Sequence, residues 1–249
     1  MVFTNSRDPN INQGNWNNPI NNVAPAPGSA DPRSGIAAVS TQQGTVQVFW
    51  IRPDGVVLTN ARDPNINQGN WNNPINNVAP APGSADPRSG IAAVSAQQGT
   101  VQVFWIRPDG VVLTNARDPN INRGNWNNPI AIGSGADPRS GVAAVSRQFG
   151  CVDVLWVSAA GEIMTSARNP FKNNGDFTSP TRIAPPGSAY SSSPVGAACS
   201  SLNAVEVFWI RSDGMIFTNA QNPNINGGNW NQPINNVAPL PGSAATPQR

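Results

Sequence analysis

The stretch Ser34–Ile75, SGIAAVSTQQGTVQVFWIRPDGVVLTNARDPNINQGNWNNPI, decides the fold because the chain repeats it almost unchanged. The second copy, Ser89–Ile130, differs from it at only two positions. Looser copies begin at Ser140 and Ser193, and the chain opens with the second half of one more copy. A period of about 50 residues is typical of propellers and solenoids, whose units bury their faces against their neighbours.

Each copy contains four segments of strand length. In the second copy Gly90–Ser95 is small and apolar, and Thr100–Arg107 is β-branched and aromatic. The turn Pro108-Asp109-Gly110 leads into a return strand, Val111–Asn115, and a last short strand lies near Ile130. Four strands in a meander form a propeller blade, and no 3.6-residue apolar period appears, so we predict an all-β propeller.

The copies predict four full blades plus a half. We expect a single propeller domain over 1–249, with a partial blade at 1–33 and blades at about 34–88, 89–139, 140–192 and 193–249. Three alternatives explain the half: a three-part or two-stranded fifth blade, a fragment of a longer ring, or chains that assemble to hide open edges. We expect a homo-oligomer, because a lone open arc exposes sheet faces.

The bulk composition excludes two classes of partner. Only 11% of the 249 residues are charged and the net charge is +2, so we expect no nucleic-acid binding. No stretch approaches the ~20 apolar residues of a membrane span, so we expect no membrane insertion. No signal peptide is visible, and we expect a soluble protein that is cytoplasmic or exported by a non-classical route.

Catalytic and metal sites are not expected. The chain has no His, and its two cysteines, Cys151 and Cys199, replace small polar residues of the repeat, which favours free thiols over a disulfide. The loop at Asp118 resembles the front of a calcium loop but lacks its distal Glu, so we interpret it as an Asx-type turn. Asp153 and Glu206 allow a facing carboxylate pair, yet we predict no enzyme and no cofactor.

The eight tryptophans occupy two repeat positions. One set ends the second strand of each blade, where we expect core packing: Trp50, Trp105, Trp156 and Trp209. The other set follows a polar loop, with Phe177 in its place in one copy: Trp16, Trp71, Trp126 and Trp230. A half-exposed indole stacks on the apolar face of a sugar, so we predict that this second set binds sugar. The alternative is a ring that packs blade to blade at the rim.

Two sets of arginines repeat as well. The set before the Pro-Asp-Gly turn is predicted to donate hydrogen bonds to a ligand: Arg52, Arg107 and Arg211. The set after the third strand stands beside aspartates in most copies, and we interpret it as ordering the loop: Arg7, Arg62, Arg117 and Arg168.

The order IAAVS, VQVFWI, PDG and GNW resembles the fucose-lectin-like β-propellers of fungi and bacteria, over the four repeats and the leading half. The resemblance implies binding of glycans, as a monosaccharide or a glycoconjugate. Where those lectins place an Arg in the second strand, this chain has Gln47, Gln102, Asp153 and Glu206. Where they place a Glu in the third strand, it has Thr59, Thr114, Thr165 and Thr218. Only the aromatic carries over, so the resemblance does not imply fucose specificity.

We therefore expect a multivalent carbohydrate-binding lectin with repeated shallow sugar sites between blades and no catalysis. The alternative is a non-catalytic propeller scaffold, or an engineered or amplified propeller fragment that completes its fold by self-assembly.

Overall fold

The computed structural model describes residues 1–6, 16, 21–42, 44–66, 70–72, 76–200, 203–231, 235–238 and 240–244. The described residues form β-strands, joined by turns and by short 3-10 helices. No helix in this part of the chain is long and apolar enough to cross a membrane.

The strands make one two-stranded sheet and four four-stranded antiparallel sheets. The half-blade is β1 (Val2–Thr4) and β2 (Asn21–Ala24). Blade 1 is β3 (Ile36–Val39), β4 (Val46–Ile51), β5 (Val57–Arg62) and β6 (Asn76–Ala79). Blade 2 is β7 (Ile91–Val94), β8 (Val101–Ile106), β9 (Val112–Arg117) and β10 (Ile130–Gly133). Blade 3 is β11 (Val142–Gln148), β12 (Cys151–Val157), β13 (Ile163–Arg168) and β14 (Thr181–Ala184). Blade 4 is β15 (Val195–Cys199), β16 (Val205–Ile210), β17 (Ile216–Gln221) and β18 (Asn235–Ala238). The predicted four-stranded meander is confirmed.

The turn between the second and third strands is fixed by its Pro-Asp-Gly sequence. In blade 1 Arg52 accepts from the Gly55 N–H at 2.9 Å and itself donates to Val56 O at 2.9 Å. Gly55 has φ +82°, and a Cβ there would lie 2.5 Å from Ala85 O, so only glycine fits. This turn therefore sets the register of the hairpin and holds the chain that leads to the next blade.

The core is divided into clusters that lie between blades. Phe49 and Ile51 of blade 1 pack with Val103 and Trp105 of blade 2, and equivalent clusters join the other neighbours. The second strand is buried on both faces in blades 1 to 3. In blade 4 the burial of β16 alternates, because only one of its faces is covered by another described blade.

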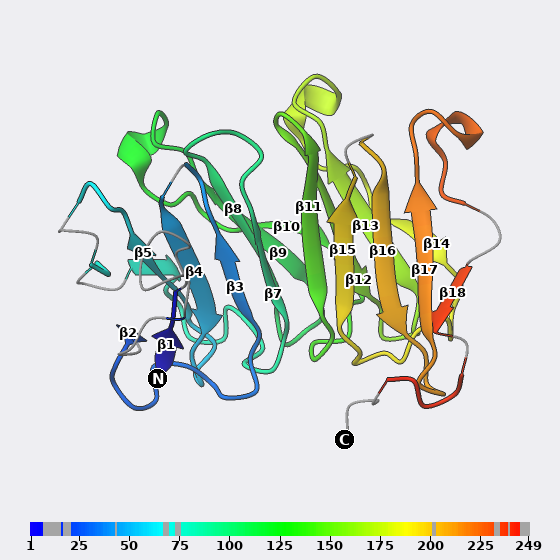
Figure 1. Ribbon diagram of the computed structural model, residues 1–249, viewed down its shortest axis with the longest axis horizontal. Helices are drawn as coiled ribbons and strands as arrows, with labels where there is room; N and C mark the ends of the chain where they lie inside the picture. The colour runs from blue at the N-terminus through cyan, green and yellow to red at the C-terminus, as the bar shows by residue number, and fades with distance from the viewer. Residues whose placement is uncertain are drawn as a thin grey trace.

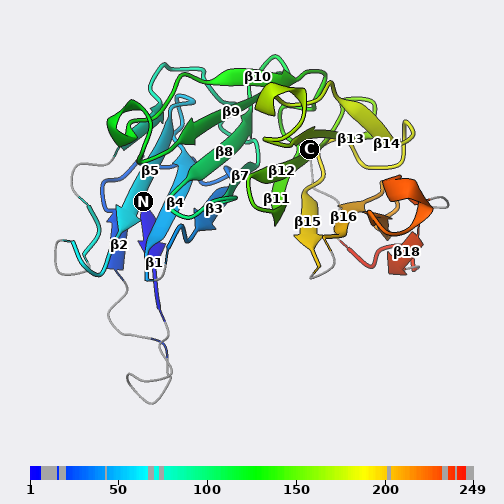
Figure 2. The ribbon, with the colours of Figure 1, turned by 90° about the horizontal axis from the view of Figure 1, so that it is seen from above.

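The blades stand side by side in an arc, with β3, β7, β11 and β15 adjacent to one another on its inner side (Figure 2). Along these inner strands Gly35, Gly90 and Gly141 each donate from N–H to a serine carbonyl of the next blade, at 3.0–3.1 Å. A Cβ at Gly141 would lie 2.6 Å from Val195 N, so glycine permits this close approach. The inner strands thus hold the blades together through backbone hydrogen bonds.

The face of blade 1 that is turned away from blade 2 is only partly covered by the half-blade. Ile36 on β3 is 59% exposed, whereas its counterpart Ile91 on β7 is 6% exposed. The half-blade packs Val2 and Val23 against Trp50 and Leu58, but it has no described strand beside β3. The open apolar surface therefore lies at the inner strand of blade 1.

Candidate functional site: the seams between blades

Three grooves follow the seams between neighbouring blades. We call them seam 1 (blades 1 and 2), seam 2 (blades 2 and 3) and seam 3 (blades 3 and 4). Their cavities measure about 190, 130 and 550 Å³. All three lie at the end of the blades that carries the 3-10 helices η3 (Asn122–Gly124), η4 (Asn173–Gly175) and η5 (Asn226–Gly228), at the top of Figure 1.

Seams 1 and 2 are lined by equivalent residues of the repeat, with Thr41 in seam 1 where seam 2 has Ala96. Every residue that lines seam 2 has its repeat counterpart in the lining of seam 1. The polar pairs are Gln42 and Gln97, Thr45 and Thr100, Gln47 and Gln102, Asp63 and Asp118, and Asn72 and Asn127. Amide, hydroxyl and carboxylate groups in one groove supply both donors and acceptors, which is the set that a polyhydroxylated ligand needs.

The two grooves are closed at one end by a hydrogen bond between blades. Gly99 N–H donates to Thr41 O at 2.9 Å across seam 1, and Gly150 N–H donates to Ala96 O at 2.8 Å across seam 2. Gly99 and Gly150 have φ of 80° and 74°, a left-handed backbone conformation that favours glycine. The tight turn of each incoming blade therefore fixes the width of the groove.

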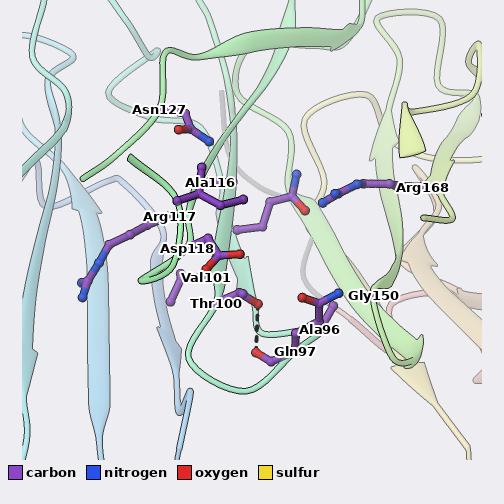
Figure 3. A pocket seen from close by; sticks show the side chains of 12 residues that line it. Ala96, Gln97, Thr100, Val101, Ala116, Arg117, Asp118, Asn127, Gly150 and Arg168 are labelled. Atoms are coloured by element: carbon purple, nitrogen blue, oxygen red, sulfur yellow. Dashed lines mark hydrogen bonds between the residues drawn. The ribbon is translucent and has the colours of Figure 1, made fainter. Parts of the chain in front are cut away.

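The next blade contributes an arginine to each of these grooves. Arg117 of blade 2 lines seam 1, and Arg168 of blade 3 lines seam 2. Figure 3 shows Arg168 reaching from the side of blade 3 toward the other lining residues, while Arg117 turns away from seam 2. Arg168 Nε donates to Gly175 O at 2.8 Å, whereas Arg117 Nε is buried without a hydrogen-bond partner. The sequence interpretation of this set as loop-ordering missed its reach across the seam.

Seam 3 has diverged. Asn203 replaces the turn glycine, and its N–H donates within its own turn to Ser200 O at 3.1 Å, so the closing bond of seams 1 and 2 is not made. Asp153 stands at the Gln47 position, and Arg147 binds it and donates to Gln221 Oε1 of blade 4 at 3.0 Å. The charged cross-blade contact and the lost bond make seam 3 different in both shape and chemistry.

Burial raises the pKa of Asp153, although Arg147 opposes this shift. Burial also raises the pKa of Cys199, and the nearby Asp153 carboxylate adds to the effect. Cys199 is a free thiol, as is Cys151. The pKa of Cys199 is raised, whereas a reactive thiol needs a lowered one, so the surroundings of Cys199 favour its protonated form.

The two carboxylates that the sequence allows as a facing pair are each engaged by another side chain. Asp153 is bound by Arg147, and Glu206 Oε1 accepts from Thr218 Oγ1 at 2.8 Å. Among the described residues no group of three or more His, Cys, Asp or Glu side chains is arranged to hold a metal ion.

The rim rings are half-buried between neighbouring sheets. Trp126 of blade 2 meets Phe49 of blade 1 edge to face, with centroids 5.8 Å apart, and Phe177 meets Phe104 in the same way at 6.1 Å. Trp71 and Trp230 are also half-buried against the inter-blade clusters. These contacts match the alternative interpretation of a ring that packs blade to blade.

Trp16 differs from the other rim tryptophans. Its ring belongs to the half-blade and is 62% exposed, and the described residues place no blade on its open side. It is therefore the rim indole with the most surface open to a ligand.

The predicted arginine donors lie at the other end of the blades. Arg52 directly follows β4, while Trp71 pairs with Arg62, which itself pairs with Val46 at the start of β4. A six-residue strand is roughly 20 Å long, so one sugar ring does not touch members of both sets. The predicted combination of rim tryptophan and turn arginine in one site is therefore not assembled. Equivalent positions hold the remaining members, Arg107 and Arg211.

Each turn arginine is engaged by its own turn. Arg52, Arg107 and Arg211 bind Asp54, Asp109 and Asp213 through the guanidinium group. The hydrogen bond from Arg107 lowers the pKa of Asp109 from its ordinary 3.8 to about 2.

Comparison with solved structures identifies the architecture. BP39L lectin from Burkholderia pseudomallei has a TM-score of 0.75 at 23% identity, over 90% of this chain and 60% of that chain. The chain has the fold of the β-propeller lectins. An arginine-to-alanine variant of AofleA from Arthrobotrys oligospora has a TM-score of 0.63 at 17% identity, over 84% of this chain and 58% of that chain. The Aleuria aurantia lectin, described as a six-bladed β-propeller with a novel fucose recognition mode, has a TM-score of 0.59 at 16% identity, over 85% and 64%.

The chain spans about three fifths of the length of these three proteins, with shares of 60%, 58% and 64%. The predicted resemblance and the predicted incomplete ring are therefore confirmed at the level of fold. No family model matches the sequence, and no curated protein does either.

Proposed function

We propose that the chain is a carbohydrate-binding protein whose sugar sites lie in the seams and act together. One observation carries the proposal: seams 1 and 2 present the same polar side chains at equivalent repeat positions. Equivalent grooves on a rigid arc suit repeated recognition of one ligand. They do not suit catalysis, which needs a distinct centre with free acid and base groups.

A single shallow groove of this kind binds weakly, with ~4 kcal/mol or about millimolar affinity. Several grooves on one chain raise the avidity for a glycan-coated surface by roughly 10²–10⁴. We therefore infer multivalent binding of a glycan presented at high density.

The rim rings complete the proposed sites. We infer that the rim rings add stacking surface beside the grooves: Trp126 packs at seam 1, Trp230 at seam 3, and Trp71 between the half-blade and blade 1. Trp16 offers the most exposed indole for stacking. Arg52, Arg107 and Arg211 remain proposed hydrogen-bond donors at the opposite rim, for a second part of an extended glycan. The BP39L and Aleuria aurantia proteins are lectins of the same fold, which supports a sugar as the ligand class.

A high-density glycan array tests the proposal with three variants. Asn72→Ala with Asn127→Ala removes two groove side chains whose amides make no described hydrogen bond. We expect it to abolish most of the array signal, and Trp126→Ala to weaken the signal as well. The triple change of Arg52, Arg107 and Arg211 to alanine serves as the comparison at the opposite rim, with a smaller expected loss. A folded wild-type protein that retains no glycan would favour the scaffold alternative.

Self-association is the second candidate property, and the open inner strand of blade 1 favours it. Ile36 is 59% exposed in a position that the repeat otherwise buries. We infer that a second copy of the chain covers this surface.

A further inference from the structure

A cavity of about 530 Å³ lies beside the segments that lead into the four inner strands. Each of blades 1 to 3 contributes an Arg-Ser-Gly segment, and blade 4 contributes Ser192 and Pro194. The arginines are Arg33, Arg88 and Arg139. We call this space the axial cavity. None of its lining residues lines a seam.

The first two arginines are held in place by buried carboxylates. Arg33 donates from Nε and Nη2 to Asp31 at 3.1 and 3.0 Å, and Arg88 makes the same two bonds to Asp86 at 3.2 Å each. The hydrogen bond from Arg33 lowers the pKa of Asp31, so this pair stays ionised. Each guanidinium therefore keeps one NH₂ group, Nη1, with no described protein partner.

The third arginine is held more loosely. Arg139 Nε lies 3.7 Å from Asp137 Oδ1, beyond hydrogen-bond distance, and its guanidinium has no described hydrogen bond. Its donors are therefore open to a ligand.

The charges of this cavity are layered. The side chains of Asp31, Asp86 and Asp137 are only 3%, 6% and 8% exposed, whereas those of Arg33, Arg88 and Arg139 are 67%, 45% and 47% exposed. The anions thus lie behind the cations, and three guanidinium groups form the accessible layer. Planar guanidinium groups bind phosphate and sulfate oxygens with good geometry and with charge-assisted hydrogen bonds.

We propose that the axial cavity binds a multivalent oxyanion that carries phosphate or sulfate groups. Three guanidinium groups from three blades line one cavity. A single carboxylate is too small to contact all three, and a neutral sugar carries no negative charge to pair with them. Blade 4 has Tyr190 and Ser192 where the other blades have Asp and Arg, so the cationic layer covers only part of the cavity. The site is independent of the proposed sugar grooves.

Titration calorimetry with inorganic tripolyphosphate, at an ionic strength matched with NaCl, tests the proposal. We expect saturable binding that the double variant Asp86→Asn/Arg88→Gln weakens about tenfold or more, the scale of one charge-assisted hydrogen bond. The double change leaves no buried carboxylate without its partner, and the melting temperature verifies folding. The control Glu162→Gln/Arg182→Gln removes an ion pair that lies outside the cavity and outside the proposed sugar sites, and its affinity should equal the wild type's.

A second arm distinguishes the source of the oxyanion. Binding of tripolyphosphate but not of a sulfated disaccharide identifies a phosphate ligand, and binding of the sulfated but not the unsulfated disaccharide identifies a glycan sulfate. Absence of saturable binding, equal weakening by both double variants, or equal binding of the unsulfated disaccharide would overturn the proposal. Glycan-array signals of the Asp86→Asn/Arg88→Gln variant report separately on the seams, because the two sites share no residue.

Discussion

At the scale of single residues, the four strand tryptophans show how one repeat position acquires different environments. Trp50, Trp105 and Trp209 donate from Nε1 to a serine carbonyl at 2.7–2.8 Å, but the buried Nε1 of Trp156 has no partner. The chain between blades 2 and 3 is shorter than in the other copies, and Gly133 lies directly against the Trp156 ring. The sequence predicted that these four tryptophans pack in the core. It did not predict the unpaired Nε1–H of Trp156, because that depends on how the chain from blade 2 packs against this ring.

This difference predicts unequal costs for the same substitution. Trp105→Phe removes a hydrogen bond and leaves Ser84 O without its donor, whereas Trp156→Phe removes a donor that is already unpaired. Both changes lose the same volume, so we expect Trp105→Phe to lower the free energy of unfolding by about 1 kcal/mol more. Urea unfolding of the two variants measures this difference, and equal losses would contradict it.

The Pro-Asp-Gly turn predicts a pH dependence. The pKa of Asp109 is lowered to about 2 by Arg107, so the folded state binds this proton less readily than the unfolded state. The stabilisation by the pair is therefore present above about pH 4, the unfolded pKa, and is lost as the pH falls through about 2. We expect the difference in melting temperature between wild type and Asp109→Asn to shrink to nothing over that window. A difference that persists at about pH 2 would argue against the pair.

At the scale of strands and seams, Arg147 and Asp153 replace the Ala96 and Gln102 of the preceding blade. Asp153 has only 2% of its side chain exposed, and Arg147 is its partner. Removing one member of a buried pair costs more than replacing both, because the remaining charge stays buried. The internal repeat supplies the neutral replacement, since blade 2 packs the alanine and glutamine at these positions.

We expect Arg147→Ala to lower the free energy of unfolding by about 3–5 kcal/mol. The double variant Arg147→Ala/Asp153→Gln, which recreates the blade 2 pair, should recover most of that loss. Chemical unfolding of both proteins measures the effect. A double variant no more stable than the single one would mean that Arg147 acts mainly through Gln221.

The strands themselves were largely predictable. The expected strands at 100–107 and 111–115 correspond to β8 and β9, with ends displaced by two residues or fewer, because turn residues fix where a hairpin begins. The seam sites were not predictable in the same way. Arg117 is the last residue of β9 in blade 2 but lines a groove with Gln47 of blade 1, and this proximity depends on how separate sheets pack.

At the scale of the whole molecule, the repeat predicted blades that bury their faces against one another, and the inter-blade clusters confirm it. It also predicted four full blades and a half, as the sheets show. The exposure of Ile36 follows from that arrangement, because the half-blade presents no described strand beside β3. An exposed apolar strand is a surface on which another chain readily packs.

We expect light scattering to give a mass above the 26.1 kDa of one chain, and Ile36→Glu to shift the protein toward the monomer. A buried carboxylate in the interface would be costly, since it loses its hydration. Ile225→Glu is the matched control, because Ile225 is 58% exposed on a loop at the far blade. A strict monomer, or equal effects of both changes, would exclude association through this strand.

The backbone hydrogen bonds along the inner strands give the arc a direction. Gly35, Gly90 and Gly141 each donate to the blade that follows, but blade 4 has Pro194 at this position, which carries no N–H. A duplicated unit inserted after blade 4 would lack that bond, whereas one inserted between blades 1 and 2 would keep it on both sides. The same holds for a unit inserted between blades 2 and 3 or between blades 3 and 4, so among the described blades only blade 4, with Pro194, lacks the N–H that this bond needs.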